Sequence, residues 1–496
     1  MAIFNDATDS QDPYETVDET TALLSPRSKA PSATWRPSRE ALRPMAREAL
    51  VLLKTSIPII ASYILQNSIQ TISIIIVGRS RPKDLSVAAF AYMFSTCSGW
   101  LIGMGGSTAL DTLASAAYTG GGDKHHAGVL LQRCFIVLTM LYLPVCVIWV
   151  FSGRLFILLG QDADFSWESA KFLTYLIPGG FGYIYFESLK KYLQVQGLIR
   201  PATYVMLVVS PLSGLLNYIF INNSKLGLLG APLATGLSYW ISFGLLVLYT
   251  SYISGHECWG GWNKACLNHL GAFTRIALLG IIQLGTEFWA FEIVALVAGS
   301  LGKLPLAGQS VLMTADGVLV TIPFGIGVAT SVRVGGFLGA KDLESARRSA
   351  HTSFVLTATI SIFVCLLLIL TRNHFAKIFT SESEVIRYVA LVMPWIGLFQ
   401  ITDALNGSSG GALRGMGKQH IGAAANLTSY YIIALPLGSW LAFRGWELSG
   451  LWIGQCIGMG IVASAQLVFV LATDWKLEIE RALERISEDD NTAPPV

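Results

Sequence analysis

Charged side chains are scarce in this sequence. Asp, Glu, Lys and Arg make up 13% of the 496 residues, whereas hydrophobic residues make up 53%. Soluble globular domains carry about 25% charged residues, so the composition excludes such a domain and indicates that lipid is the solvent. The formal net charge of +2 is close to zero for this length and gives no indication of a nucleic-acid partner. We therefore expect a protein that resides in the lipid bilayer.

Paired cysteines and catalytic signatures are also missing. The seven cysteines occur singly, mostly within apolar runs, without the spacing of a disulfide framework. His256, Cys258, Cys266 and His269 are close in sequence, but the spacing of the two cysteines does not match the usual zinc pattern. We interpret them as loop residues and expect no metal and no cofactor. His-Glu-x-x-His, Gly-x-Ser-x-Gly and a glycine-rich phosphate loop are absent, so we do not expect an enzyme.

Long apolar runs are what the sequence has instead. An α-helix needs about 20 residues to cross the hydrocarbon core, and backbone polar groups in lipid must be satisfied within the segment. Each run therefore predicts a helix, and together they predict an all-α polytopic membrane protein with twelve transmembrane helices. The runs lie near 53–77, 86–109, 129–151, 168–189, 202–221, 229–254, 271–300, 305–330, 350–370, 387–410, 420–442 and 447–472.

These runs define the expected organisation of the chain. We expect a disordered cytosolic tail over 1–45, a six-helix lobe over 46–255 and an interlobe cytosolic loop over 256–270. A second six-helix lobe over 271–474 and a cytosolic tail over 475–496 complete the chain. Most of the 34 Lys and Arg residues fall on the side of the two termini, and basic loops favour the cytosol, so both termini are expected to be cytosolic.

Two membranes are candidates for the location of the protein, the vacuolar membrane and the plasma membrane. Within the first tail, Glu19–Leu24 resembles the acidic dileucine signals that direct eukaryotic membrane proteins to vacuoles or lysosomes. Short patterns of this kind also arise by chance. We expect the protein to act as a monomer.

An internal repeat with an offset of about 220 residues links the two lobes. The segment Gly120–Asp123 falls on Gly339–Asp342, and Gln196–Arg200 falls on Met416–His420. Because each copy contains an even number of helices, the two copies have the same orientation in the membrane. The repeat predicts two pseudo-symmetric six-helix lobes around a central cleft, which is typical of transporters.

Several motifs along the chain resemble the eukaryotic branch of the multidrug and toxic compound extrusion family. The resemblance covers nearly all of the chain after residue 45. It implies two lobes arranged in a V around the cleft, and antiport of organic compounds against protons or sodium ions. One departure concerns Phe288, where many eukaryotic relatives carry a second tryptophan. The motifs are Pro58 and Gln66, ALDTLAS at Ala109–Ser115, YLQVQG at Tyr192–Gly197, GTEFWAFE at Gly285–Glu292, SVRVG at Ser331–Gly335 and GGALRGMG at Gly410–Gly417.

Four acidic residues lie inside predicted helices of the second lobe: Glu287, Glu292, Asp316 and Asp403. An ionisable group within a membrane helix is costly and indicates a functional site. The first lobe is neutral at the matching positions, so we expect proton or substrate binding in the second lobe. The resemblance agrees, because eukaryotic members of the family carry acidic residues at the matching places.

Glu287 is the expected coupling group, because a carboxyl in a low-dielectric cavity can exchange a proton near neutral pH. Glu292 lies about 140° further around the same helix, so the two side chains cannot point the same way. For Glu292, a direct coupling role and a structural hydrogen bond between helices both stay open. Asp316 and Asp403 either complete a cluster with Glu287 or cap irregular backbone nearby.

Other charged residues are interpreted as structural. Glu187 lies one turn from Lys190 and close to Lys191 at a helix end, so we expect a salt bridge there. Asp111 and Arg333 are interpreted as solvated or salt-bridged helix ends.

Candidates to line the substrate cavity come from both lobes. The uncharged amide of Gln66 lies in the middle of its helix, where it can contact substrate or the opposite lobe. Tyr63, Phe288, Trp289 and Tyr430 are candidates to hold flat cations against their ring faces. Packing and anchoring at the membrane interface are the alternative roles of these aromatic residues.

Proline residues mark candidate hinges. Pro58, Pro323 and Pro436 fall within the first, eighth and eleventh predicted helices, and proline kinks a helix by removing a hydrogen bond. A moving hinge and a static kink are both compatible with this pattern.

The function that these observations favour is secondary active antiport. We expect organic, cationic compounds to leave in exchange for protons by alternating access, with the bilayer and the small molecules as partners. A sodium-coupled exporter is one alternative. A lipid-linked oligosaccharide flippase is another, but it would need basic residues for pyrophosphate in its cleft.

Overall fold

A computed structural model describes residues 39–120 and 123–490. The chain divides into a unit Met1–Arg43 and a compact unit Pro44–Val496. Of the first unit, only Arg39–Arg43 is described, and the Glu19–Leu24 motif lies outside the described residues.

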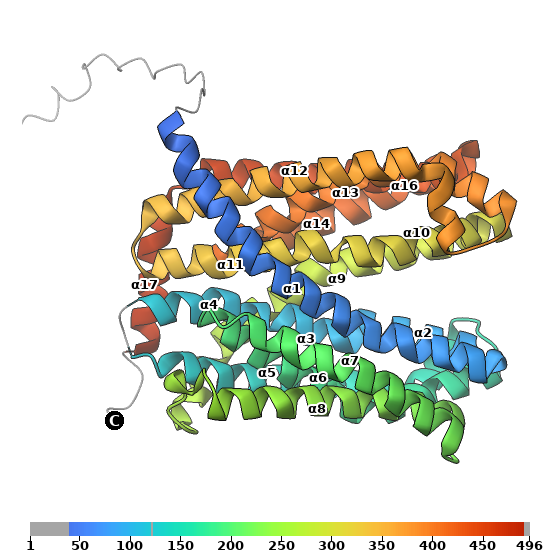
Figure 1. The fold of residues 1–496 in the computed structure, drawn as a ribbon, viewed down its shortest axis with the longest axis horizontal. Helices are drawn as coiled ribbons and strands as arrows, with labels where there is room; N and C mark the ends of the chain where they lie inside the picture. The colour runs from blue at the N-terminus through green and yellow to red at the C-terminus, as the bar shows by residue number, and fades with distance from the viewer. Residues whose placement is uncertain (1–38, 121–122, 491–496) are drawn as a thin grey trace, which may run out of the picture. The chain divides into compact units, whose positions relative to one another are not determined.

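The described residues are almost entirely helical, and each predicted apolar run lies in a helix (Figure 1). The predicted all-α fold with twelve crossings is therefore confirmed. The first six crossings consist of α1 (Arg39–Ser80), α2 (Leu85–Ser95) with α3 (Leu101–Gly106) and α4 (Thr108–Thr119), α5 (His126–Leu158), α6 (Ala163–Val195), α7 (Arg200–Tyr218) and α8 (Gly230–Tyr252). The second six consist of α9 (Leu270–Leu301), α10 (Lys303–Leu319) with α11 (Thr321–Gly339), α12 (Leu343–Phe375), α13 (Ser383–Met416), α14 (Gln419–Thr428) with α15 (Leu435–Leu441), and α16 (Glu447–Ala472).

By length and composition alone, 10 helical stretches of the described chain qualify as membrane spans. One of them, Gln419–Ala472, contains two crossings, because the backbone turns at Gly445 with φ 98°. The helix α6 forms a crossing but is not among these stretches; Gly and Tyr residues lower the hydropathy of its central segment, and charged residues lie toward both of its ends. These two observations account for the difference from twelve.

The predicted repeat is visible in the helix boundaries. The fourth crossing of each lobe begins at Ala163 and Ser383, an offset of 220 residues. Asp123 accepts a hydrogen bond from the His125 amide at 2.9 Å, and its repeat counterpart Asp342 accepts one from the Ser345 amide at 3.0 Å. The hydrogen bonds from Ser345 lower the pKa of Asp342, since they favour the carboxylate form. Both aspartates thus stabilise the start of the third crossing of their lobe.

The first predicted tail is shorter than expected. The helix α1 begins at Arg39, whereas we expected a disordered tail over 1–45. The sequence REALR at the start of α1 consists of strong helix formers, so that disorder was wrong from Arg39 onward.

The second predicted tail contains a helix, α17 (Trp475–Asp490). Trp475 and Ala482 are buried, and α17 packs against α4 of the first lobe and α11 of the second. The Arg485 guanidinium donates to the Met416 carbonyl oxygen at 3.1 Å, at the C-terminal end of α13. Tail residues therefore contact both lobes. We call the end of the bundle that carries Pro44 and α17 the terminal end.

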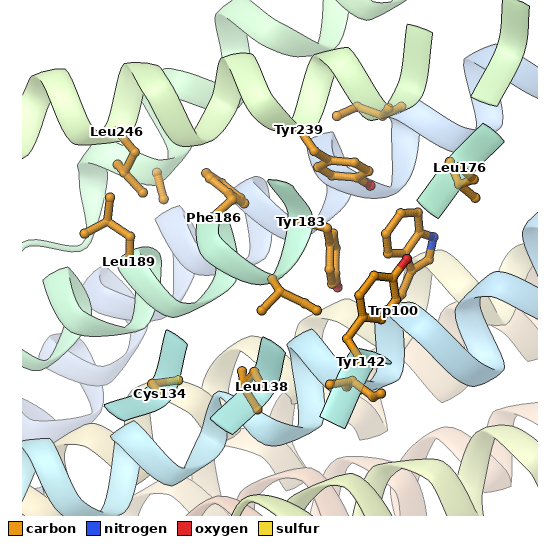
Figure 2. Close-up of a cluster of buried hydrophobic side chains, with 14 of the residues drawn as sticks. Trp100, Cys134, Leu138, Tyr142, Leu176, Tyr183, Phe186, Leu189, Tyr239 and Leu246 are labelled. Carbon is orange, nitrogen blue, oxygen red and sulfur yellow. The ribbon is translucent and has the colours of Figure 1, made fainter. Parts of the chain in front are cut away.

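Aromatic residues form the centre of the first lobe (Figure 2). The ring centroids of Trp100 and Tyr183 are 4.6 Å apart, and Tyr239 lies 5.3 Å from Trp100 and 5.0 Å from Tyr183. Such aromatic pairs contribute about 0.5–1.5 kcal/mol each beyond area burial. This cluster joins the second, fourth and sixth crossings into one body.

The two lobes meet along α4 and α11, which pack side by side (Figure 1). Gly335 and Gly339 are four residues apart on α11, and a Cβ at these positions would collide with Ser115 and Ala116 of α4. The Thr119 hydroxyl donates to the Gly336 carbonyl oxygen at 2.6 Å across the same contact. Small residues at this spacing allow two membrane helices to approach closely. We call this contact the inter-lobe seam, and it lies near the terminal end.

A second close approach, between α11 and α13, lies within the second lobe. A Cβ at Gly411 would collide with the Gly327 backbone, whereas a Cβ at Gly244 in α8 would meet no atom within 4 Å. We expect Gly411→Ala to destabilise the protein by about 1–3 kcal/mol through overpacking. The matched Gly244→Ala should stabilise it by up to about 1 kcal/mol through helix propensity. Thermal unfolding of the purified proteins in detergent tests this, and equal midpoints would contradict it.

The three candidate hinge prolines have different settings. Pro58 lies inside the continuous helix α1, and its carbonyl oxygen accepts a hydrogen bond from Thr203 at 2.7 Å. Pro323 is the third residue of α11, just after the break that separates α10 from α11. Pro436 follows the π-helical segment Ser429–Ala434. The break before Pro323 and the π-helical turn before Pro436 are local irregularities, but motion at these sites stays a prediction.

Candidate transport site

Glu287 lies on α9 and is half-buried within the second lobe. The Asn406 side chain on α13 donates to Glu287 Oε2 at 3.5 Å. Asn406 is oriented in turn by Gln466, whose Nε2 donates to Asn406 Oδ1 at 3.1 Å. The Ser409 hydroxyl donates to Gln466 Oε1 at 3.0 Å. This chain of hydrogen bonds directs the Asn406 amide N–H groups toward Glu287.

Asp316 and Asp403 are more deeply buried than Glu287. Asp316 is 5% exposed, and Gln400 Nε2 donates to its Oδ1 at 2.7 Å. Asp403 is 3% exposed, and among the described residues its Oδ2 has no hydrogen-bond partner. Asp403 interacts electrostatically with both Glu287 and Asp316. The structure therefore brings these three carboxyls into one cluster, in which Asp403 has an unused acceptor oxygen.

The helix α13 carries Asp403 and the amides that contact the other two carboxyls. Gln400, Asp403 and Asn406 are spaced three residues apart, so they lie near one face of the helix. Asp403 was predicted from the sequence, whereas Gln400, Asn406 and Gln466 were missed. The sequence signal that could have found them is the repetition of polar residues at helical spacing within an apolar segment. This signal is weaker than that of a charged residue.

Glu292 lies apart from the cluster and points toward the first lobe. Cys97 on the second crossing donates its thiol to Glu292 Oε1 at 3.8 Å, a weak hydrogen bond. The indole N–H of Trp289 donates to the Cys97 carbonyl oxygen at 2.9 Å. The divergence of Glu287 and Glu292 agrees with their expected separation around the helix. Glu292 and Trp289 on the helix α9 thus contact the first lobe, and α9 also packs against α3.

The other aromatic candidates are less accessible than Trp289, which is 39% exposed. Phe288 is half-buried. Tyr430 is fully buried, with its hydroxyl 3.5 Å from Met459 Sδ. Tyr63 is buried in the first lobe. In this conformation Tyr63 and Tyr430 act as packing residues, the alternative role considered for them.

Gln66 belongs to a buried ionic network in the first lobe. Lys190 Nζ donates to Glu187 Oε1 at 2.6 Å and to Gln66 Oε1 at 3.0 Å. Gln66 Nε2 donates to Glu187 Oε1 at 2.7 Å, so both ends of the amide are occupied by protein groups. Lys190 Nζ also lies 3.9 Å from the centroid of the Tyr63 ring, a cation–π contact. These contacts satisfy the Gln66 amide in the middle of its helix without a bound substrate.

The expected salt bridges are confirmed, but the four side chains of the first lobe lie within the helix bundle and not at the end of the buried region, where the sequence had placed them. The Glu187–Lys190 pair is 0% exposed. Asp111 pairs with Lys191 at 2.8 Å, and these side chains are also 0% exposed. The helix α6 continues beyond them to Val195 and is surrounded by other helices, so the end of the apolar run was not the end of the buried region.

Two further charged residues connect the lobes near the terminal end. Arg333 on α11 makes two hydrogen bonds to Glu48 on α1, at 2.7 and 2.6 Å. Arg414 on α13 is buried and interacts electrostatically with Asp111 of the first lobe and Glu287 of the second. Among the residues that the structure covers, Arg414 Nε and Nη2 have no hydrogen-bond partner. Arg414 therefore lies between the charged groups of the two lobes.

No group of three or more His, Cys, Asp or Glu side chains in the described part of the chain is arranged to hold a metal ion. Cys258 and Cys266 lie in separate 3-10 turns of the interlobe segment. The site therefore consists of carboxyls, amides and one guanidinium.

Comparison with known proteins extends this description. The family model described as MatE matches residues 58–219 and 281–440, one segment in each lobe. The human protein named "Multidrug and toxin extrusion protein 1" is 32% identical over 428 residues, covering 86% of this chain and 75% of that protein. An uncharacterised transporter of Schizosaccharomyces pombe is 33% identical over 445 residues, covering 89% of this chain and 82% of that protein. The crystal structure of the eukaryotic MATE transporter AtDTX14 superimposes with a TM-score of 0.84 at 32% identity, covering 89% of this chain and 99% of that one.

Twelve membrane crossings in two related lobes, with carboxyls enclosed in one of them, define a polytopic membrane transporter rather than an enzyme. The two separate matches of one family model agree with the internal repeat. The chain belongs to the MatE family of multidrug and toxin extrusion transporters.

Proposed function

We propose that this protein exports organic cations in exchange for protons, with Glu287 as the coupling carboxyl. The observation that carries the proposal is the cluster of Glu287, Asp316 and Asp403 in the second lobe, with Asp403 Oδ2 unpaired among the described residues. Buried carboxylates are unfavourable without a cation. A proton and an organic cation both relieve that cost, so each disfavours binding of the other. This competition couples the two movements.

The inter-lobe seam supports alternating access as the mode of transport. In this conformation α4 and α11 pack against each other near the terminal end, and Arg333 pairs with Glu48 on the same side. Opening the protein toward that side requires these contacts to separate. We assign the terminal end to the cytosol because basic residues concentrate there, and we keep the vacuolar and plasma membranes as the two candidate locations.

Efflux of a fluorescent organic cation from proteoliposomes with an imposed pH gradient tests the proposal. We expect gradient-driven movement with the wild type and a rate equal to that of empty liposomes with Glu287→Gln, because the amide cannot exchange a proton. Glu168→Gln is the matched control, since Glu168 is an exposed carboxyl on α6. It should retain the wild-type rate.

The same assay distinguishes the alternatives. Movement that follows a sodium gradient and does not depend on pH would identify sodium, instead of the proton, as the coupling ion. Full activity of Glu287→Gln would reject this residue as the coupling group. If no organic cation moves under either gradient, the export proposal fails and flipping of a lipid-linked oligosaccharide becomes the function to test.

A further inference from the structure

A cavity of about 400 Å³ lies at the end of the second lobe opposite the terminal end. It is formed where α12 ends and α13 begins, in the part of the bundle far from α17 (Figure 1). This volume is within the range of small-molecule sites, about 300–1,000 Å³. The residues that line it are Arg372, Asn373, Lys377, Ser383, Ile386, Arg387, Ala390 and Leu391.

Three cationic side chains converge on this cavity. Arg372, Lys377 and Arg387 are exposed, and within the described chain none of them has a hydrogen bond or ion pair. The nearest carboxylates in sequence, Glu382 and Glu384, are exposed and do not line the cavity. Three positive charges around one cavity favour a negatively charged group between them. The charge of the lining therefore points to an anionic ligand.

The start of α13 adds to this preference. Ser383 is the first residue of the helix, and no side chain caps the amide groups of its first turn. Free amide groups and the helix dipole favour an anion at such a position. This contribution supplements the three cations.

One wall of the cavity is apolar and open to the outside. Ile386, Ala390 and Leu391 line it, and Leu391 is 68% exposed. Close by along the chain, Leu370 and Ile378 also expose large apolar side chains. On a membrane-spanning helix, exposed apolar residues next to basic ones mark the boundary between hydrocarbon and headgroups. The cavity thus joins a cationic region to a surface that faces acyl chains.

We propose that this cavity binds an anionic phospholipid of the surrounding leaflet. Arg372, Lys377 and Arg387 hold the phosphate group, and an acyl chain lies along Ala390 and Leu391. A membrane lipid satisfies both parts of the lining, whereas a free phosphate ion satisfies only the cationic part. The site is separate from the carboxyl cluster, so this inference does not depend on the proposed transport function.

The first lobe differs at the corresponding place. With the offset of 220 residues between the starts of α6 and α13, Arg387 corresponds to Trp167. The Trp167 ring packs over Gly153 of α5, at 2.8 Å from where a Cβ of Gly153 would lie. The first lobe thus has an aromatic ring packed on a helix where the second lobe has a cation at a cavity. Its exposed cations Arg154 and Lys171 supply a matched control.

Lipid binding by the purified full-length protein in detergent tests the proposal. Native mass spectrometry and thermal unfolding are measured with added phosphatidylglycerol, phosphatidylcholine or inorganic phosphate. We expect retention of phosphatidylglycerol over phosphatidylcholine and a higher unfolding midpoint with phosphatidylglycerol. The triple variant Arg372→Gln, Lys377→Gln, Arg387→Gln should bind phosphatidylglycerol roughly 100-fold more weakly, from about 1 kcal/mol per basic residue. The control Arg154→Gln, Lys171→Gln should bind it like the wild type.

Three results would overturn the proposal. Equal retention of phosphatidylglycerol by the triple variant and the wild type would show that these cations do not form the site. Equal retention of the two lipids by the wild type would remove the preference for an anion. Stabilisation by inorganic phosphate equal to that by phosphatidylglycerol would mean a free-anion site instead of a lipid site. If the triple variant does not fold, the single variant Arg387→Gln takes its place, with weaker binding expected.

Discussion

Transport should stop completely when the inter-lobe seam is cross-linked. An ideal Cβ on Gly336 lies 3.7 Å from Thr119 Cγ2, an atom one bond beyond the Thr119 Cβ, so the two positions are near enough for a disulfide to be tested; such a bond requires roughly 3.5–4.5 Å between Cβ atoms. We expect Thr119→Cys with Gly336→Cys to form a disulfide between α4 and α11 under mild oxidation. If alternating access separates this seam in each cycle, the linked protein cannot complete one. Efflux should fall to the rate of empty liposomes and recover on reduction.

Controls for this experiment use the single variants. Thr119→Cys and Gly336→Cys alone should remain active under oxidation, which excludes effects through the seven natural cysteines. Mass spectrometry measures the extent of cross-linking. Full efflux by a quantitatively cross-linked protein would mean that the seam stays closed throughout the cycle, and the alternating-access part of our proposal would be rejected.

Loss of Lys191 should be the most destabilising single change in the first lobe. Lys191→Met leaves the Asp111 carboxylate buried without its cation, and Asp111 Oδ1 already lacks a hydrogen-bond partner among the described residues. Removing one partner of a buried ion pair costs about 3–5 kcal/mol. The unfolding midpoint in detergent should therefore fall sharply. Lys171→Met, at an exposed lysine of the same helix, should change stability by less than about 0.5 kcal/mol.

Replacing both partners separates the cost of a buried, unpaired charge from the contribution of the ion pair itself. Asp111→Leu combined with Lys191→Met removes the buried charge as well as the pair, and such replacements are often neutral or stabilising. The double variant should therefore be more stable than Lys191→Met alone. If Lys191→Met unfolds at the same midpoint as Lys171→Met, the ion pair contributes nothing measurable and this interpretation is wrong.

The fold was largely predictable because the signals behind it are long and repeated. Each crossing requires about 20 apolar residues, and the repeat supplied two examples of every landmark, such as Asp123 and Asp342. The carboxyls Glu287, Asp316 and Asp403 were equally visible, because charge inside an apolar segment is rare. Signals of this kind do not depend on knowing which helices are neighbours.

Side-chain partners were not predictable in the same way. Gln66 was considered as a substrate contact, but its amide is held by Glu187 and Lys190 from a helix more than a hundred residues away in sequence. Asn406 and Gln466 were missed because a neutral amide becomes informative only when its neighbour is known. Such contacts depend on tertiary packing, which helical periodicity does not specify.

The ionic network of the first lobe also bears on how the protein responds to voltage. Its two ion pairs, Glu187 with Lys190 and Asp111 with Lys191, contain two positive and two negative side chains whose formal charges cancel. A membrane potential does work only on net charge that moves through it, about 2.3 kcal/mol per elementary charge for each 100 mV. Movement of these four side chains with their lobe is therefore electrically silent. Any voltage dependence of the cycle must come from elsewhere, and in the function that we propose it comes from the carboxyls of the second lobe and the cations that bind to them.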